Sequence, residues 1–366
     1  MQINKNQLIV LIILFEIGST TLYALGVGTV KQDAWLAIMI ASLIGGGLLW
    51  MYTSIQKYYY QQDLGGILTI VLGRWISKPI ILLYALYFIY IASLNLYTFS
   101  ITTEITILPG TPLLAIQTLI VLVLIYIVAF LNIEVLARTG EILAPLFLLF
   151  LIIIYTLVIF SGVFHGNNLL PMMENGIPNI ISTSIFKILN FPFAETIVFL
   201  MYWKYVDCKQ SIRKFSFIAY VISSLFIIIS IIVVIGVLGV TVASITTLPL
   251  FNVLQKIDLG NFVIRLDPLG VSILFIGGFF KMVLNFYAGL LLLQSLFKIA
   301  CSKWMTIIVC IVFLCGTSLQ FPSITIQRWI GLSIMIPYVH TIFQVGIPCL
   351  IFILIKVKFK TKNNSL

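Results

Sequence analysis

The sequence predicts an all-α polytopic membrane protein with about ten transmembrane helices, and three observations lead to this fold class. Hydrophobic residues make up 61% of the 366 positions and charged residues only 9%, whereas a water-soluble domain carries roughly a quarter charged residues. Apolar runs of about 20 residues recur along the chain, and each is long enough to cross a ~30 Å hydrocarbon core. No polar run is long enough for a soluble domain, so we expect one integral membrane domain over residues 1–366.

The ten predicted spans follow one another with short connections. They cover residues 8–29, 34–54, 79–103, 112–131, 142–163, 184–203, 215–240, 268–297, 304–320 and 331–355. The stretch 63–73 is too short to cross, and we expect it to form a short helix at the membrane surface.

The distribution of basic residues predicts the orientation of these spans. With the N-terminus inside, 15 of the 21 Lys and Arg residues lie on the cytoplasmic face. The outer face receives Lys31, Lys187, Lys256, Arg265 and Arg328. Basic loops stay on the cytoplasmic side, so both termini are expected there. These loops also explain the formal net charge of +10, which therefore does not indicate nucleic-acid binding.

Ten helices divide into two halves of five, at about residues 1–183 and 184–366. Because five is odd, the second half begins on the opposite side of the membrane from the first. This is the condition for an inverted-topology repeat, in which broken helices occupy matching positions of the two halves. The first and sixth spans occupy such matching positions.

Both spans contain residues that favour a break. From Leu14 to Gly26 the first reads LFEIGSTTLYALG, and the sixth contains Pro192 within NFPFAE, residues 190–195. Proline removes a backbone donor and clashes with the preceding turn. Backbone freed at membrane depth is tolerated only where it lines a cavity or is buried in protein. We expect both helices to be broken around a small-ligand site, although the small residues of the first span alone would equally suit close helix packing.

Three ionisable residues fall well inside predicted spans: Glu16, Glu195 and Lys281. A charge at the bilayer centre costs at least ~2.5 kcal/mol, so such residues face the bundle interior and find partners. We expect Lys281 to pair with Glu195 or with Glu16. The pair either forms a fixed internal bridge or titrates and couples to a ligand, and the residues leave both readings open.

Other motifs are weaker. Tyr97 in the third span is expected to line the cavity or to hydrogen bond within the core. His165 and His340 show no metal-ligand spacing, and the sequence contains no nucleophile elbow or phosphate loop. We therefore predict neither an enzyme nor a bound cofactor or metal.

A set of short segments, in order along nearly the whole chain, resembles the spore germination permease family. The segments are Ile17-Gly-Ser, Gln32-Asp-Ala-Trp35, Leu72-Gly-Arg-Trp75, Glu134-Val-Leu-Ala-Arg138-Thr-Gly-Glu-Ile-Leu-Ala-Pro145, Phe191-Pro-Phe-Ala-Glu195-Thr-Ile-Val-Phe, Arg265-Leu-Asp267, Phe280-Lys281 and Phe286-Tyr287-Ala. These permeases are the B subunits of nutrient germinant receptors and belong to the amino acid–polyamine–organocation superfamily. The chain departs from the family in lacking a proline after its first helix.

The resemblance implies a LeuT-like five-plus-five fold with a ligand held between helices 1, 3, 6 and 8. Carried onto this chain, the ligand contacts are Gly18, Ser19, Thr20, Tyr97, Phe191, Phe193, Ala194, Glu195, Lys281 and Asn285. It also implies a place in the spore inner membrane, in a complex with an A subunit and a lipoprotein C subunit.

Two functions are then in competition. The first is a receptor subunit that binds a small nutrient, expected to be an amino acid, and triggers germination. The second is a proton-coupled amino acid secondary transporter, and fold alone does not decide between them. A channel or a purely structural subunit fits less well, because it leaves the broken helices unexplained. For the ligand, a nucleoside or a sugar stays open beside the amino acid.

Overall fold

The computed structural model describes residues 2–18, 20–174, 176–257, 266–298, 303–321 and 323–363. Within these ranges the regular structure is helical, apart from an isolated parallel bridge between Ile3 and Val206. The helical architecture therefore agrees with the fold class that the composition predicts.

The helices alternate between long spans and short connecting pieces. The α-helices are α1 Lys5–Ile17, α2 Val27–Val30, α3 Ala34–Tyr58, α4 Leu64–Leu72, α5 Arg74–Thr106, α6 Leu113–Ile125, α7 Ile133–Phe160, α8 Ile177–Thr183, α9 Ile212–Ile245, α10 Pro249–Lys256, α11 Asp267–Ile273, α12 Phe279–Phe297, α13 Lys303–Gln320, α14 Ile324–Trp329 and α15 Ile347–Asn363. The π-helical pieces are η3 Tyr126–Phe130, η5 Ser184–Ile188, η9 Leu274–Gly278 and η10 Ile330–Gly346. The 3₁₀ pieces are η1 Thr20–Leu22, η2 Lys31–Asp33, η4 Gly166–Leu169, η6 Phe193–Met201, η7 Trp203–Tyr205 and η8 Lys209–Ser211.

Nine continuous helical stretches in the described residues are long and apolar enough to cross a membrane. The predicted span that is missing from these nine is the first, residues 8–29. It is not continuous, because α1 ends after 13 residues. The sixth span begins at Ile177, seven residues earlier than predicted, since Pro178 occupies the first turn of α8. A short helix does occupy the predicted surface stretch: α4, capped by the Asp63 carboxylate, which accepts from the Gly66 N–H at 2.8 Å.

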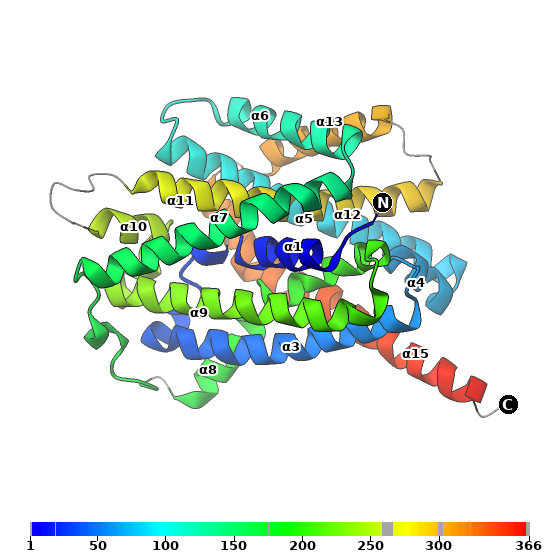
Figure 1. Ribbon diagram of the computed structural model, residues 1–366, viewed down its shortest axis with the longest axis horizontal. Coiled ribbons are helices and arrows are strands. Elements are labelled where there is room, and N and C mark those ends of the chain that lie inside the picture. Colours follow the sequence, from blue (N-terminus) through cyan, green and yellow to red (C-terminus); the bar gives the residue numbers. More distant parts are fainter. Residues whose placement is uncertain are drawn as a thin grey trace.

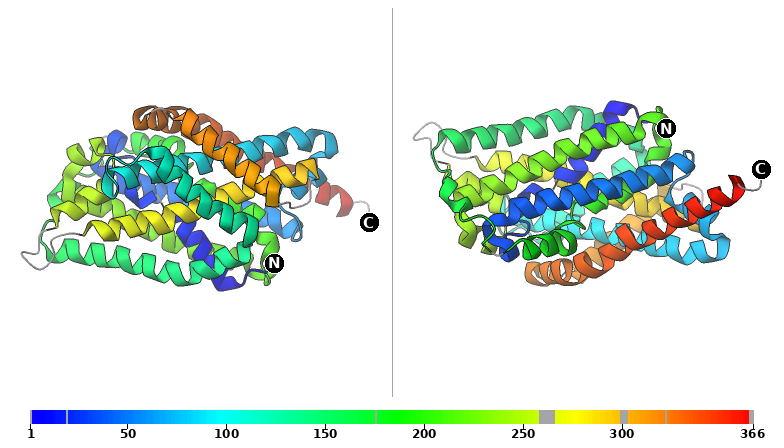
Figure 2. Two further views of the ribbon diagram at one scale, coloured as in Figure 1. Left: turned by 90° about the horizontal axis from the view of Figure 1, so that it is seen from above. Right: turned by 90° about the horizontal axis from the view of Figure 1, so that it is seen from below.

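The long helices run side by side along the longest axis of the molecule (Figure 1). Seen from below, α7, α9, α3 and the η10–α15 segment lie next to one another in that order (Figure 2, right). α12 packs along α5, while α1 is enclosed by α9, α7 and α12. The first helix is therefore the central element of the bundle, and all its residues from Leu11 to Ile17 are buried.

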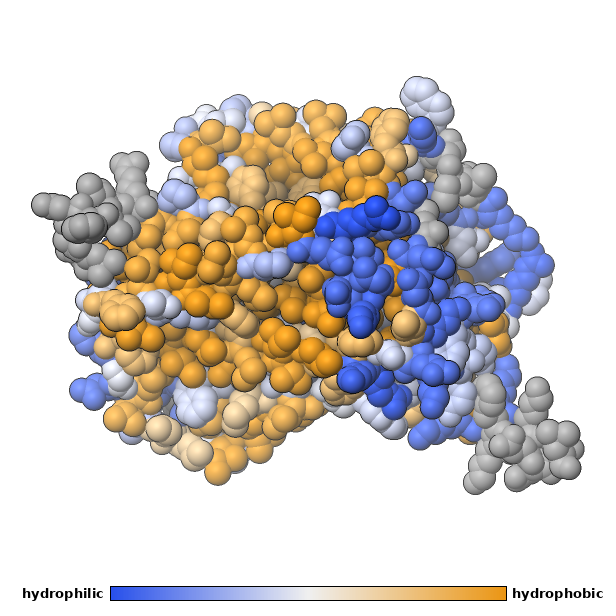
Figure 3. Space-filling model, viewed as in Figure 1, coloured by the Kyte–Doolittle hydropathy of each residue, from blue (hydrophilic) through white to orange (hydrophobic). Residues whose placement is uncertain are grey.

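The surface matches this arrangement. Hydrophobic residues cover most of the visible face, and hydrophilic residues gather at the end that holds the N-terminus (Figure 3). The start of α1 and the end of α15 both lie toward this end of the molecule (Figure 1). An apolar belt with a polar end is what a multi-pass membrane protein presents to a bilayer.

Candidate functional site

The first helix breaks where its glycine and hydroxyl residues begin. The last backbone bond of α1 runs from the Gly18 N–H to the Leu14 carbonyl at 3.1 Å. The Thr20 hydroxyl then donates to the Glu16 carbonyl at 2.7 Å, so a side chain satisfies an acceptor that a continuous helix would pair with backbone. The next α-helix begins only at Val27. Ser19, a predicted ligand contact, lies outside the described residues.

The sixth span breaks around Pro192. π-Helical η5 ends at Ile188, and 3₁₀-helical η6 begins at Phe193. Across the gap the Ala194 N–H donates to the Leu189 carbonyl at 2.9 Å. The Ala194 carbonyl accepts from the Tyr52 hydroxyl of α3 at 3.4 Å. The freed backbone is thus paired partly within its own span and partly by α3, as membrane depth requires.

The break in the sixth span is joined to α12 by a buried ion pair. Lys281 Nζ lies 2.5 Å from Glu195 Oε2, and the two side chains are 0% and 2% exposed. The same ammonium lies over the rings of Phe191, at 4.3 Å, and Phe15, at 5.2 Å, which adds cation–π attraction. Of the two partners expected for Lys281, the structure selects Glu195.

Glu16 is the other carboxylate of this central site. Its side chain is completely buried, and among the described residues neither carboxylate oxygen has a hydrogen-bond partner. Among the described residues, Lys281 and Glu195 are charged groups that act on it electrostatically. The central site therefore holds two buried carboxyl groups and one ammonium, with one carboxyl group unpartnered.

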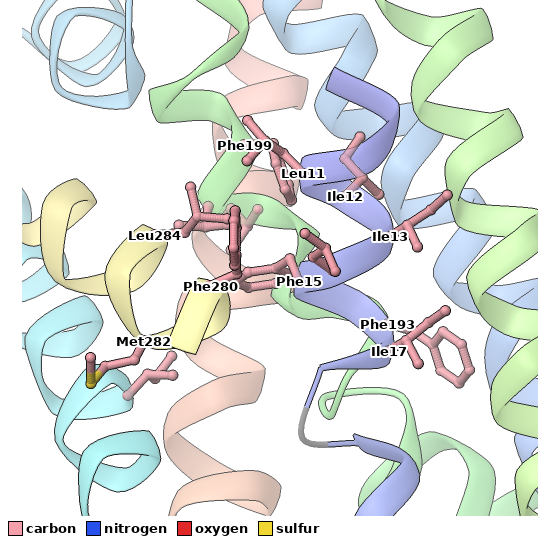
Figure 4. Close-up of a cluster of buried hydrophobic side chains, with 14 of the residues drawn as sticks. Leu11, Ile12, Ile13, Phe15, Ile17, Phe193, Phe199, Phe280, Met282 and Leu284 are labelled. Carbon is pink, nitrogen blue, oxygen red and sulfur yellow. The ribbon is translucent and has the colours of Figure 1, made fainter. Parts of the chain in front are cut away.

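Close packing of backbone holds these elements together. A Cβ on Gly277 of η9 would lie 2.5 Å from the Cα of Gly18, and one on Gly18 would lie 3.0 Å from the Gly277 carbonyl oxygen. Only glycine permits so close an approach. Figure 4 shows the apolar contact beside this crossing, where Phe15 of α1 meets Phe280 of α12. The break in the first helix is therefore fixed against the eighth span, which carries Lys281.

The remaining predicted contacts are distributed around the site. Asn285 lies one turn after Lys281 on α12, and its side-chain amide donates to the Lys281 carbonyl at 2.9 Å. The Tyr97 ring contacts Phe321 at 5.2 Å, and the Phe193 ring contacts Tyr220 at 5.8 Å. Figure 4 shows Phe193 beside Ile17, apart from Phe280 and Leu284. These ring contacts of Tyr97 and Phe193 do not involve the ion pair, and the role of both residues toward a ligand stays a prediction.

A buried polar network on the tenth span was missed by sequence reasoning. The Gln344 amide donates to the Tyr87 hydroxyl at 2.8 Å and lies 3.0 Å from His340 Nδ1. The Tyr52 hydroxyl, which also faces the sixth-span break, donates to the Gln344 carbonyl. Asn190, inside that break, donates to the Ile336 carbonyl at 2.9 Å. The available signal was the i, i+4 spacing of His340 and Gln344 in an apolar span.

Two solved structures share the fold of this molecule. The crystal structure of MhsT in complex with L-phenylalanine matches with a TM-score of 0.61, covering 92% of this chain and 87% of that one at 16% identity. The structure of Mhp1, a nucleobase-cation-symport-1 family transporter, in a closed conformation with bromovinylhydantoin bound, matches with a TM-score of 0.56. This match covers 89% of this chain and 74% of that chain at 15% sequence identity. The predicted LeuT-like fold, with its broken first and sixth helices, is confirmed.

The sequence comparisons then give the family. The family described as "Spore germination protein" matches residues 2–325. Spore germination protein KB of Bacillus subtilis (strain 168) is 31% identical over 370 residues, covering 100% of this chain and 97% of that protein. Spore germination proteins A2 and YndE of the same organism are 25% and 22% identical, over 77% and 74% of this chain and 76% and 73% of their own lengths. The chain belongs to the spore germination protein family, as the ordered segments predict.

Proposed function

We propose that this chain is the B subunit of a nutrient germinant receptor, which binds a small nutrient between its broken helices and triggers spore germination. Membership of the spore germination protein family and the full-length similarity to protein KB support the receptor role. The shared fold with MhsT, which was solved in complex with L-phenylalanine, supports a central small-molecule site.

The observation that carries the proposal is the unpartnered Glu16 carboxyl group beside the Lys281–Glu195 pair. A buried polar group without a partner is costly, and a ligand that supplies the missing partner gains from it. The ammonium group of an amino acid has the charge and the donors that Glu16 lacks. The site therefore suits an amino acid, whose carboxylate would find Lys281 and the freed N–H groups of the breaks.

Binding must also change the helix arrangement. Glu16, Glu195 and Lys281 are all at most 3% exposed, so a ligand reaches them only when helices separate. A ligand shifts such an equilibrium only by its different affinity for the two states. In our proposal the two halves, about 1–183 and 184–366, move relative to each other, and the A and C subunits detect the motion. The receptor lies in the spore inner membrane with both termini in the cytoplasm.

The test is ligand-dependent thermal stability of the purified full chain across amino acids, sugars and nucleosides. At a hundredfold excess over Kd a ligand adds about 2.7 kcal/mol to the free energy of unfolding. We expect one amino acid to raise the melting temperature of the wild type but not of Glu16→Gln. Glu134→Gln is the matched control, because Glu134 pairs with Arg138 at the surface of α7 and should leave the response unchanged.

Each part of this proposal can fail separately. A sugar or nucleoside that stabilises the wild type, while every amino acid does not, overturns the amino acid assignment but keeps the central site. An amino acid response that persists in Glu16→Gln shows that this carboxyl group is not its partner.

The second candidate is a proton-coupled amino acid transporter. It is favoured by the same unpartnered carboxyl group, which is suited to accept a proton, and by the fold shared with the transporter Mhp1. Uptake of the stabilising amino acid into proteoliposomes separates the two functions. Accumulation driven by a pH gradient would establish transport, whereas binding without accumulation is expected of the receptor.

A further inference from the structure

A cavity lies away from the central site, at the end of the molecule where α1 begins and α15 ends. Its volume is about 390 Å³, which is within the range of small-molecule sites. The last turns of α3 form one wall, and η8 with the first turn of α9 forms the other. The residues that line it are Thr53, Gln56, Lys57, Tyr60, Lys209, Gln210, Ile212 and Arg213.

The lining carries three positive charges and no carboxylate. Lys57, Lys209 and Arg213 contribute the charges, and Thr53, Gln56, Gln210 and Tyr60 contribute neutral polar groups. Within the described part of the chain, no ion pair involves any of the three cations. The cavity therefore concentrates positive charge that the surrounding protein does not neutralise.

One of these cations is held in place by neutral groups. Arg213 donates through Nη2 to the Ser54 hydroxyl at 2.6 Å and through Nε to the Thr53 hydroxyl at 3.2 Å. Its guanidinium also lies 5.4 Å from the centre of the Trp50 ring. These contacts fix the group without cancelling its charge. Arg213 also lies in the first turn of the 34-residue helix α9, where the helix dipole adds positive potential.

The surroundings of the cavity connect it to the membrane. Trp50 is 46% exposed, seven residues before Lys57 on the same helix. Its ring contacts Phe352 of α15 at 5.9 Å. An apolar aromatic surface thus leads from the cavity along α3 into the hydrophobic part of the protein. Aromatic rings and basic residues gather in this way at the level of lipid headgroups.

From these observations we propose that the cavity between α3 and α9 is a binding site for a phosphate group, recognised by Lys57, Lys209 and Arg213. Arginine and lysine hold phosphate through charge-assisted hydrogen bonds. The phosphate can belong to an anionic phospholipid of the adjacent leaflet or to a free ion. A headgroup bound here would link α3 to α9, two helices that pack against each other and flank the broken first and sixth spans. The proposal does not depend on the identity of the nutrient.

Thermal stability of the full chain in an uncharged detergent tests the site with three probes. The probes are dioctanoyl phosphatidylglycerol, dioctanoylglycerol, which has the same acyl chains but no phosphate, and inorganic phosphate against chloride at equal ionic strength. We expect the phosphatidylglycerol to raise the melting temperature and the dioctanoylglycerol to leave it unchanged. Stabilisation by inorganic phosphate as well would identify free phosphate as a sufficient ligand.

Matched lysine variants localise the effect. Lys209→Gln should weaken the apparent affinity for the phosphatidylglycerol by about tenfold, because one charge-assisted contact is lost. Lys214→Gln removes the same charge from an exposed position of α9 outside the cavity lining and should leave the affinity unchanged. Equal losses in the two variants would show that only general surface charge matters. That result, or stabilisation by neither phosphate-bearing probe, overturns the proposed site.

Discussion

Two lysine–carboxylate pairs in this molecule have nearly the same nitrogen–oxygen distance but differ in how far water reaches them. In the central site Lys281 and Glu195 approach to 2.5 Å with side chains 0% and 2% exposed. Between η7 and the start of α4, Lys204 and Asp63 approach to 2.6 Å with side chains 22% and 17% exposed. The inner pair joins the broken sixth span to α12, whereas the outer pair joins two surface connections.

The comparison teaches that distance alone does not give the value of an ion pair. Water reaches the partly buried outer pair and screens it in part, so its contribution to stability is about the 0–1 kcal/mol of exposed pairs. The inner charges have lost their hydration, so each depends on the other, and removing one partner costs about 3–5 kcal/mol. Stability therefore depends strongly on both charges of the inner pair, which lies next to the unpartnered Glu16. It depends only weakly on the outer pair.

The largest expected effect comes from breaking the inner pair. Lys281→Met should lower the free energy of unfolding by about 3–5 kcal/mol, because it leaves Glu195 buried without its ammonium. The melting temperature of the purified protein measures this loss. The double variant Lys281→Met with Glu195→Met should recover most of it, since a buried pair can be replaced by apolar side chains of similar volume. A double variant no more stable than the single one would contradict this account.

An intermediate effect should follow from widening the crossing that holds the inner pair. A Cβ on Gly277 would lie 2.5 Å from the Gly18 Cα, and backbone cannot move aside as a flexible side chain can. We expect Gly277→Ala to cost about 1–3 kcal/mol, as overpacking of a core does. Gly278→Ala is the control, because its new Cβ would meet only Leu274 Cδ1 at 3.7 Å. Equal melting temperatures for the two variants would show that the crossing is not tight.

The comparison also separates what the sequence can predict from what it cannot. Glycines, hydroxyl residues and Pro192 weaken helices locally, so both breaks follow from residue types. Buried charges need partners, so a pair at Lys281 follows as well. The choice of Glu195 over Glu16 does not follow, because it depends on how three helices are rotated relative to one another.

The polar network of the tenth span shows the same limit. His340 and Gln344 lie on a π-helical stretch, η10, 17 residues long, and an apolar sequence gives no signal that distinguishes this from an α-helix. Their partner Tyr87 is 257 residues away along the chain from Gln344. Which side chains meet over such separations is decided by tertiary packing, which residue spacing within one span does not contain.

The smallest expected effect comes from the outer pair. It tests whether screening by solvent distinguishes the two pairs. Burial lowers the pKa of Lys204, but the Asp63 carboxylate and its hydrogen bond, together with Tyr205, outweigh this and raise the pKa above the usual 10.5. A raised pKa means that the stabilisation is fully present below the unfolded pKa and is lost as pH rises through the folded one. Lys204→Gln should therefore cost about 1 kcal/mol at pH 8, and the difference from the wild type should shrink above pH 10.5.

Raising the salt concentration to about 1 M should also shrink the loss caused by Lys204→Gln, because the Debye length falls to ~3 Å. The same salt series on Lys281→Met should leave the larger loss unchanged, and an equal salt dependence of both variants would mean that water reaches the inner pair.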